Sequence, residues 1–211
     1  MGHSLKILGR TSSINVRKVL WTCHELGIDY AHQDDWGIGF KPTQSAEFLA
    51  LNPNAQIPVL IDDHGVLWES NTICRYLVSL YQRYDLLPAD PAPRARVEQW
   101  MDWQATELNR AWGDAFTALV RNNPDGLDAG QIKIAVKVWN DKMGILEQQL
   151  AKTGAYVAGD EFTLADILIG LSVHRWQMTP MERPPYPAVA AYYQRLGQHP
   201  GFKTFALDLA N

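Results

Sequence analysis

Three consecutive hydroxyl side chains, Thr11, Ser12 and Ser13, stand directly before a predicted helix near the N-terminus. The helix is indicated by apolar residues that recur at helical spacing from Val16 to Leu26. Serine and threonine are favoured at helix N-termini, because their oxygens accept hydrogen bonds from the free N–H groups of the first turn. The stretch therefore predicts a helix cap, and it leaves open that one hydroxyl points at a reactive group.

Two further polar residues, Glu69 and Ser70, lie where an apolar strand pattern is followed by a helical pattern. Ser70 can cap this helix, and the acidic Glu69 is favoured at its positive end. The same place also suits a ligand, because the free N–H groups of a helix N-terminus bind carboxylates. Ser70 would then hold a carboxylate and Glu69 an ammonium group, and together they would recognise the head group of an amino acid.

Pro58 begins the apolar stretch PVLID, in which it cannot donate a hydrogen bond to a neighbouring strand. A trans proline at the start of an edge strand accounts for this position. A cis Ile57–Pro58 peptide bond is the alternative, although only about 5% of such bonds in folded proteins are cis. A cis bond would turn the Ile57 backbone away from the sheet, and its N–H and C=O could then pair with an extended peptide.

The elements that position these residues divide the chain into two halves. The first half is predicted to have the order β-α-β-α-β-β-α, with strands at 5–8, 29–33, 58–62 and 65–68 and helices at 16–26, 45–51 and 69–84. Strand patterns then stop, and helices are predicted over 94–121, 128–152, 163–175, 187–196 and 201–206. The stretch at 86–93 contains three prolines and is typical of a linker. The predicted fold class is an α/β domain followed by an all-α domain.

The composition is that of a globular protein, with 46% hydrophobic residues and a net charge of -4 in 211 residues. Lysines and arginines are scattered, so a nucleic-acid partner is not expected. No apolar run approaches the roughly 20 residues of a membrane span. The only two cysteines, Cys23 and Cys74, lie in helical patterns, so a disulfide framework is not expected. A reducing, cytoplasmic location is the simplest inference. The six histidines lack ligand-like spacing, so no metal is expected.

The stretches QIPVL and ESNTICRYL, in this order within such a first half, resemble the cytosolic glutathione transferases. The resemblance covers nearly the whole chain. It implies a thioredoxin-like, glutathione-binding domain at 1–85, a linker at 86–93 and an all-helical domain at 94–211 that forms a hydrophobic substrate pocket.

The resemblance also assigns roles to the residues described above. It implies that the Ile57–Pro58 bond is cis and that the Ile57 backbone pairs with the cysteinyl residue of glutathione. It implies that Glu69 and Ser70 bind the γ-glutamyl head group of glutathione. Thr43, Gln44 and Gln56 are the polar candidates for the glycyl end, although related proteins often carry His or Lys at the positions of Thr43 and Gln56.

The closest pattern is that of bacterial, theta-like and delta-like classes, in which a serine activates the glutathione sulfur. A hydroxyl that donates a hydrogen bond to sulfur favours the nucleophilic thiolate, and the positive end of the following helix adds to this effect. In those classes the serine precedes a basic residue by four positions, as Ser13 precedes Arg17. Ser13 is therefore the predicted catalytic residue, with Thr11 and Ser12 as alternates. Asn15 departs from the pattern, since proline is frequent at its position.

Aromatic residues in both halves are candidates for the pocket that binds the hydrophobic co-substrate. They are Trp36, Phe40, Trp112, Phe116 and Trp176. By contrast, Thr163 and Asp166 are predicted to form a structural capping box with no catalytic role.

The predicted function is glutathione transfer to a small hydrophobic electrophile by a homodimeric enzyme. A glutathione-dependent peroxidase, dehalogenase or isomerase would share the same glutathione site. A binding or protein-interaction module without activity is a further alternative, because fold does not fix function. A thiol oxidoreductase is disfavoured, because no cysteine stands at the start of the first helix.

Overall fold

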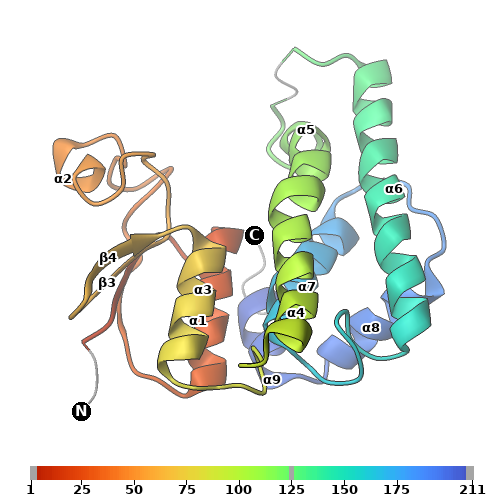
Figure 1. Ribbon diagram of the computed structural model, residues 1–211. Helices are drawn as coiled ribbons and strands as arrows, with labels where there is room; N and C mark the ends of the chain where they lie inside the picture. The colour runs from red at the N-terminus through yellow and green to blue at the C-terminus, as the bar shows by residue number, and fades with distance from the viewer. Residues whose placement is uncertain (1–3, 124–125, 208–211) are drawn as a thin grey trace. The chain divides into compact units, whose positions relative to one another are not determined.

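The computed structural model of the chain describes residues 4–123 and 126–207. These residues form two compact units (Figure 1). Unit 1 consists of residues 4–87 and 200–207, and unit 2 consists of residues 88–123 and 126–199.

Unit 1 contains the strands and helices that the first half of the sequence predicts, in the predicted order. They are β1 (Lys6–Leu8), α1 (Ile14–Leu26), β2 (Ala31–Gln33), α2 (Ala46–Leu49), β3 (Val59–Asp62), β4 (Gly65–Trp68) and α3 (Ser70–Leu80). The turn between β3 and β4 is held by Asp62, whose Oδ1 accepts hydrogen bonds from the N–H groups of His64 (2.8 Å) and Gly65 (3.1 Å).

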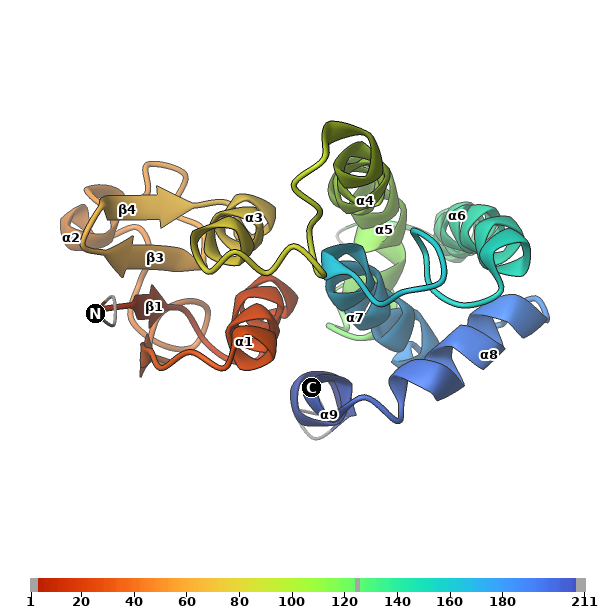
Figure 2. The ribbon, with the colours of Figure 1, turned by 60° about the horizontal axis from the view of Figure 1, so that its bottom comes forward.

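The four strands form one sheet in the order β2-β1-β3-β4. β1 and β2 are parallel, whereas β1–β3 and β3–β4 are antiparallel. Figure 2 shows α1 and α3 together on one face of this sheet, with α2 on the other side. This arrangement is the thioredoxin-like fold that the resemblance implies.

Each face of the sheet carries its own part of the core, because successive side chains of a strand point to opposite faces. Ile7 and Leu60, paired across β1 and β3, are almost fully buried. The neighbouring pair, Leu8 and Val59, belongs to a second cluster that includes Phe48 of α2. Phe48 therefore anchors α2 to the sheet.

The last described segment of the chain packs against α1. It consists of α9 (Pro200–Phe202) and a π-helical turn, η2 (Lys203–Leu207). The rings of Phe202 and Trp21 lie 5.7 Å apart. Gly201 permits this approach, because a Cβ atom there would lie 2.1 Å from Trp21 Nε1. This part of the predicted helical domain thus groups with unit 1, and residues 208–211 lie outside the described residues.

Unit 2 is helical, as the second half of the sequence predicts. Its elements are α4 (Pro91–Trp103), a π-helical turn η1 (Gln104–Leu108), α5 (Asn109–Leu119), α6 (Ala129–Thr153), α7 (Leu164–Met178) and α8 (Pro187–Leu196). The sequence predicts one helix over 94–121, and the π-helical turn within it is a feature that the apolar pattern did not indicate.

The segment predicted as a linker at 86–93 is shorter in the structure. Leu86 and Leu87 are buried, and α4 already begins at Pro91 with Asp90 as its N-cap. Proline fits the first turn of a helix, because the N–H that it lacks would have no partner there. Two of the three prolines that suggested a linker, Pro91 and Pro93, therefore lie in the first turn of the helix instead.

Helix α7 forms the centre of unit 2 and is buried over most of its length. The predicted capping box is confirmed at its N-terminus, where the N–H and the hydroxyl of Thr163 both donate to Asp166 Oδ2 (2.9 and 3.1 Å). Asp166 Oδ1 accepts hydrogen bonds from Val157 N (3.0 Å) and from the Tyr192 hydroxyl (2.9 Å). This carboxyl group therefore connects α7 with α8 and with the loop before α7.

Candidate functional site

The register of the sheet brings three loops of unit 1 to one edge. Leu8, the last residue of β1, pairs with Val59, the first residue of β3, and Val59 pairs with Trp68, the last residue of β4. The segments beyond these residues are 9–13, 57–58 and 69–70. The predicted catalytic and peptide-binding residues therefore gather at the same edge, although they are far apart in the sequence.

Gly9 lets the loop after β1 lie against the loop before β3. Its φ is +138°, and a Cβ atom there would lie 2.9 Å from Ile57 Cβ and 2.7 Å from Val16 Cγ2. Only glycine fits so close an approach with such a backbone angle. The segment that carries Thr11, Ser12 and Ser13 is thereby held next to Ile57.

The three hydroxyl groups differ in their partners. The Thr11 hydroxyl donates to Asp34 Oδ1 at 2.7 Å, and the Thr11 N–H donates to the same oxygen. The Ser12 hydroxyl accepts a hydrogen bond from Arg10 Nη1 at 3.1 Å. Ser13 is the N-cap residue of α1, but its side chain makes no capping hydrogen bond and has no other hydrogen-bond partner among the described residues. Of the three, only Ser13 has a hydroxyl with no hydrogen-bond partner in the described chain, while the Ser12 hydroxyl acts as an acceptor alone.

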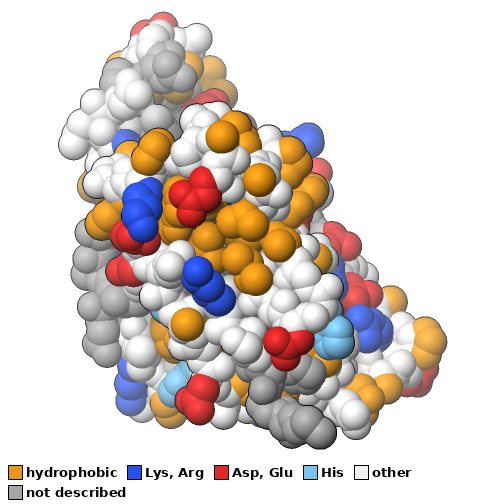
Figure 3. Space-filling model, turned by 90° about the vertical axis from the view of Figure 1, so that its left-hand side faces the viewer, with side chains coloured by type: hydrophobic (Ala, Val, Ile, Leu, Met, Phe, Trp, Pro, Cys, Tyr) orange, Lys and Arg blue, Asp and Glu red, His pale blue; other side chains and the backbone are white. Residues whose placement is uncertain are grey.

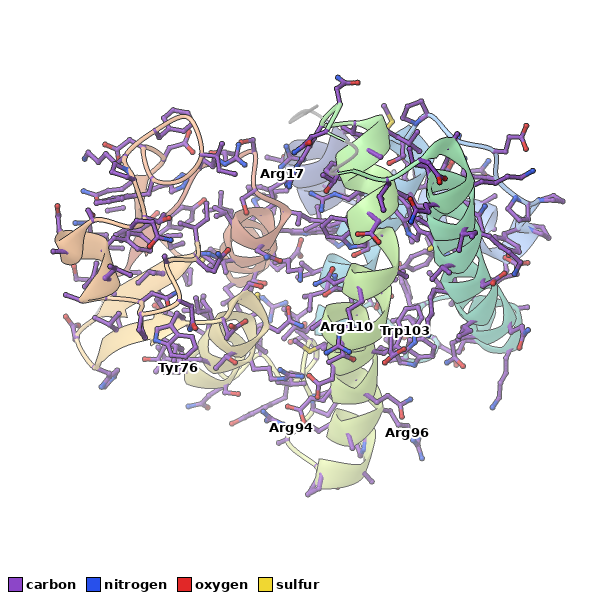
Figure 4. The ribbon with its side chains drawn as sticks, turned by 90° about the horizontal axis from the view of Figure 1, so that it is seen from above. Arg17, Tyr76, Arg94, Arg96, Trp103 and Arg110 are labelled. Atoms are coloured by element: carbon purple, nitrogen blue, oxygen red, sulfur yellow. The ribbon has the colours of Figure 1, made fainter. Side chains whose placement is uncertain are left out.

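Two buried cations of α1 lie behind this loop. Arg17, labelled in Figure 4, donates from Nε to the Thr11 carbonyl at 2.9 Å and so fixes the loop. Burial lowers the pKa of Arg17. Lys18 is 1% exposed and donates from Nζ to Asn71 Oδ1 at 3.2 Å, which joins α1 to the first turn of α3. Both side chains place positive charge close to the elements that carry the predicted site.

The Ile57–Pro58 peptide bond is cis, which confirms that expectation. The N–H and C=O of Ile57 form no hydrogen bond with the rest of the described chain. The carbonyl of the preceding residue, Gln56, accepts a hydrogen bond from Asn52 Nδ2 at 2.8 Å, which holds the loop from the other side. The Ile57 backbone is therefore able to pair with an extended peptide.

Glu69 and Ser70 begin α3. Glu69 is the N-cap residue with φ +74°, a backbone angle that is uncommon for residues other than glycine. Its side chain is exposed and makes no capping hydrogen bond. Ser70 is 7% exposed, and its hydroxyl forms no hydrogen bond within the described chain. The start of α3 thus offers an unused hydroxyl and a carboxylate at the same place.

The three polar candidates for the glycyl end occupy the loops beside α2. Thr43 is half-buried, and Gln44 and Gln56 are exposed. No hydrogen bond among the described residues engages their side chains. They remain predictions.

The five aromatic pocket candidates are not equivalent. Trp36 and Trp176 are each 3% exposed: Trp36 packs in the core cluster with Phe48, and Trp176 donates from Nε1 to Asn140 Oδ1 at 2.9 Å. These two rings are committed to packing, so they offer little surface to a ligand. Phe40 is 56% exposed, and Trp112 and Phe116 of α5 are half-buried.

Unit 2 also has a groove of about 290 Å³ between α5 and α6, which includes Arg110, Asp114 and Ile134. Figure 4 labels Arg110 on α5. None of the predicted pocket residues lines this groove.

Sequence reasoning missed two residues that shape the site. Asp34 binds the Thr11 hydroxyl from 23 positions away, and Asn71 binds the buried Lys18 from 53 positions away. Neither pairing follows from local spacing, because each depends on the tertiary contact between loops or helices.

The two cysteines are free and buried. Burial raises the pKa of Cys74 to about 11 and that of Cys23 further still. Since the thiolate is the reactive form, neither is suited to thiol chemistry. Within 4–123 and 126–207, no three His, Cys, Asp or Glu side chains are grouped as metal ligands. No helix in the same ranges has the length and apolar character needed to cross a membrane.

The fold and the loops at the sheet edge define a thioredoxin-like unit joined to a helical unit. The glutathione S-transferase N-terminal domain family matches residues 12–80, and the C-terminal domain family of the same proteins matches residues 107–195. The chain belongs to the glutathione S-transferase family.

Individual relatives agree with this assignment. Glutathione S-transferase GstB of Escherichia coli strain K12 is 36% identical over 94% of this chain and 96% of its own length. Glutathione S-transferase 3 of Zea mays is 34% identical over 94% of this chain and 91% of its own length. Among solved structures, the theta class enzyme of Xanthomonas axonopodis pv. citri with glutathione bound has a TM-score of 0.89, with 34% identity and 97% of each chain covered.

Proposed function

We propose that this glutathione transferase binds glutathione at the edge of the unit 1 sheet and activates its sulfur with Ser13. The observation that carries the proposal is the difference among the three hydroxyls: the Thr11 O–H donates to Asp34, the exposed Ser12 oxygen accepts from Arg10, and the half-buried Ser13 hydroxyl has no partner in the described chain. The Ser13 hydroxyl donates to the sulfur, and the N-terminus of α1 adds positive potential.

The reaction begins when the thiol loses its proton to solvent. Hydrogen bonding to the charged form lowers the thiol pKa, and each unit is worth about 1.4 kcal/mol of preference for the thiolate. The thiolate sulfur then attacks an electrophilic carbon, a C–S bond forms, and the leaving group departs with its bonding electrons. Arg17 takes no part in bond making; it holds the loop through the Thr11 carbonyl.

Peptide recognition falls to the other two loops. The Ile57 N–H and C=O pair with the cysteinyl backbone of glutathione, Ser70 and the start of α3 bind the γ-glutamyl carboxylate, and Glu69 binds its ammonium group. The open backbone at Ile57 and the unused hydroxyl of Ser70 support these roles. Thr43, Gln44 and Gln56 are proposed for the glycyl end. Phe40, Trp112 and Phe116 are proposed to contact a small hydrophobic electrophile, since their rings are the exposed or half-exposed ones.

The experiment that tests this function compares alanine variants at the three hydroxyls. Ser13→Ala is expected to lower kcat/KM by about ten- to a thousandfold, the range for losing one donor to an anion. The ultraviolet absorbance of the thiolate should show a raised pKa of bound glutathione. Thr11→Ala and Ser12→Ala should each cost less.

Glu69→Gln provides the contrasting control, because it should weaken glutathione binding in calorimetry while Ser13→Ala leaves the affinity nearly intact. If Thr11→Ala or Ser12→Ala moves the pKa of bound glutathione and Ser13→Ala does not, the activating hydroxyl has been misassigned.

We also propose that the enzyme is a cytoplasmic homodimer. Large apolar side chains of unit 1 are exposed, among them Ile38 (76%) and Val66 (44%). Figure 3 shows hydrophobic side chains gathered in the middle of one face. Most soluble oligomers are two-fold homodimers, in which such surface is covered. Light scattering should give a particle of twice the 23.8 kDa chain, and a particle of one chain at micromolar concentration would contradict the proposal.

A further inference from the structure

The end of β2 and the residues directly after it fix the loop that carries the three hydroxyls. The N–H of Gly9 donates to the carbonyl of Gln33 at 3.0 Å. The next N–H in the loop, that of Arg10, donates to the carbonyl of Trp36 at 3.0 Å. We call residues 33–36 the holding segment, because it binds the loop at successive backbone positions.

Asp34 contributes a side-chain contact from the holding segment. Its Oδ1 accepts hydrogen bonds from both the N–H and the hydroxyl of Thr11, the latter at 2.7 Å. The same oxygen lies 4.0 Å from His32 Nε2, which donates to the Gly9 carbonyl at 2.8 Å. Within the residues that the structure describes, the Asp34 carboxylate accepts hydrogen bonds from Thr11 alone.

Thr11 lies in the turn that presents Ser13. The Ser13 N–H donates to the Arg10 carbonyl at 3.0 Å, which closes a turn with Thr11 and Ser12 at its centre. Arg17 Nε, from the first turn of α1, donates to the Thr11 carbonyl at 2.9 Å. Thr11 is therefore held at its N–H, its hydroxyl and its carbonyl.

The direction of the Ser13 hydroxyl depends on the backbone of this turn. No hydrogen bond of its own fixes it, because the hydroxyl has no partner in the described chain. A misplacement of about 1 Å near a reacting atom can cost about a hundredfold in rate. Loss of the Asp34 carboxylate would release the N–H and the hydroxyl of Thr11 together, and only the Arg17 contact would then hold this residue.

We propose that Asp34 is a positioning residue for the transferase reaction: it holds Thr11 so that the turn directs the Ser13 hydroxyl at the glutathione sulfur. The proposal rests on the proposed function and adds to it a residue that acts through another one. The charge of Asp34 by itself has the opposite effect, because a negative charge near the sulfur disfavours the thiolate. Positioning and charge are therefore distinguished by the sign of their effects.

The test measures the pKa of bound glutathione from the ultraviolet absorbance of its thiolate. Asp34→Ala should raise this pKa and lower kcat/KM by about five- to thirtyfold, the range for losing one or two hydrogen bonds. The electrophile is 1-chloro-2,4-dinitrobenzene, in which the sulfur adds to the carbon that bears chlorine and chloride leaves with the electrons of the C–Cl bond. The affinity for S-methylglutathione, which has no thiol to ionise, should stay nearly intact, because Ile57, Glu69 and Ser70 are assigned to peptide recognition.

Two further variants separate the hydrogen bonds from the charge. Asp34 is exposed, so its replacement leaves the core intact. Asp34→Asn keeps an oxygen that can accept from Thr11 and should retain most of the activity. Asp35→Ala is the matched control, because it removes the same charge one position away, and Asp35 Oδ2 contacts Lys41 Nζ at 2.6 Å rather than the loop. It should leave the pKa of bound glutathione unchanged or slightly lower.

A double variant tests whether Asp34 acts through Ser13. Adding Asp34→Ala to Ser13→Ala should give no further rise in the pKa of bound glutathione, because the hydroxyl that it directs is already absent. A full further rise would overturn the proposal. Other titratable or charged groups near the loop are the same in all Asp34 variants, so their effects cancel in the comparison; they are Arg10, Arg17, His32, Asp35 and Lys41.

The remaining outcomes separate this proposal from the proposed function. If Ser13→Ala raises the pKa of bound glutathione and Asp34→Ala leaves it unchanged or lowers it, only the positioning role of Asp34 is wrong. If Ser13→Ala leaves that pKa unchanged, the proposed function and the positioning role fail together. An Asp34→Asn variant as impaired as Asp34→Ala, or an equal rise with Asp35→Ala, would also overturn the proposal, since the acceptor oxygen at position 34 would then not matter.

Discussion

Two helix N-termini in this protein begin with the same kind of residue and use it differently. At α7, Thr163 and Asp166 bind each other, and Asp166 also accepts hydrogen bonds from Val157 and Tyr192. At α1, Ser13 occupies the N-cap position, but its hydroxyl makes no capping hydrogen bond. We call the N-terminus of α7 closed, because its own side chains make the capping hydrogen bonds. We call that of α1 open, because its N-cap side chain makes none.

The difference separates a structural cap from a candidate site. Asp166 is fully buried, so its hydrogen bonds hold the core of unit 2. Ser13 is half-buried and lies at the edge where the cis-proline loop and the start of α3 also lie. A hydroxyl at a helix N-terminus is therefore a candidate for ligand binding only where it makes no capping hydrogen bond to its own helix.

Removing the closed cap should have the largest effect. Asp166→Ala leaves the Val157 N–H and the Thr163 N–H buried without their acceptor, and it leaves the Tyr192 hydroxyl only the backbone carbonyl of residue 166 at 3.5 Å. We expect a loss of about 3–5 kcal/mol of unfolding free energy, measured by urea denaturation. Asp160→Ala, at an exposed position in the loop before α7, is the control and should change stability by less than about 0.5 kcal/mol. Equal effects of both variants would show that Asp166 does not hold the core.

The same carboxyl group should give unit 2 a pH-dependent stability. Burial raises the pKa of Asp166 from 3.8 to about 6, against the effect of its hydrogen bonds. Because the folded protein then binds the proton more tightly than the unfolded chain, this contribution is present below about pH 4 and is lost as the pH rises through about 6. Two units of pKa correspond to up to about 3 kcal/mol.

The comparison with Asp166→Asn isolates this contribution, because the amide does not titrate. The stability of the unmodified protein relative to this variant should fall between about pH 4 and pH 7. Other carboxyl groups act in the opposite sense: the hydrogen bond from Arg83, for instance, lowers the pKa of Asp85. They are common to both proteins and cancel in the difference. A difference that does not vary with pH contradicts the raised pKa of Asp166.

The sequence predicted the parts of the molecule that depend on local patterns. The strand and helix order of unit 1 followed from apolar spacing, and the capping box at Thr163 followed from two residues three positions apart. The prediction that Ile57–Pro58 is cis came from resemblance, because local rules favour trans.

Features that depend on tertiary contacts were not predictable in this way. The packing of residues 200–207 on α1 depends on the space left by Gly201, and the π-helical turn at Gln104 accompanies a hydrogen bond to Ser172, 68 positions away. Sequence reasoning also could not rank the three hydroxyls by partner, because Asp34 and Arg10 take up two of them only in the folded chain. Trp36 and Trp176 illustrate the reverse problem, since an aromatic side chain in the core and one in a pocket look alike in a sequence.

The smallest expected effect is also the one that sharpens the comparison most: the stability cost of removing each cap hydroxyl. Thr163→Ala removes a hydroxyl that donates to buried Asp166 and should cost about 1–2 kcal/mol of unfolding free energy. Ser13→Ala removes a hydroxyl with no partner in the described chain, so it should cost less than about 0.5 kcal/mol. Activity should show the opposite order, because Thr163→Ala leaves the sheet edge of unit 1 intact. Urea denaturation and kcat/KM are measured on both variants. If the N-terminus of α1 binds a ligand, Thr163→Ala should lose more stability and Ser13→Ala should lose more activity. A stability loss for Ser13→Ala as large as that for Thr163→Ala would mean that α1 is capped like α7, and the serine would then be structural.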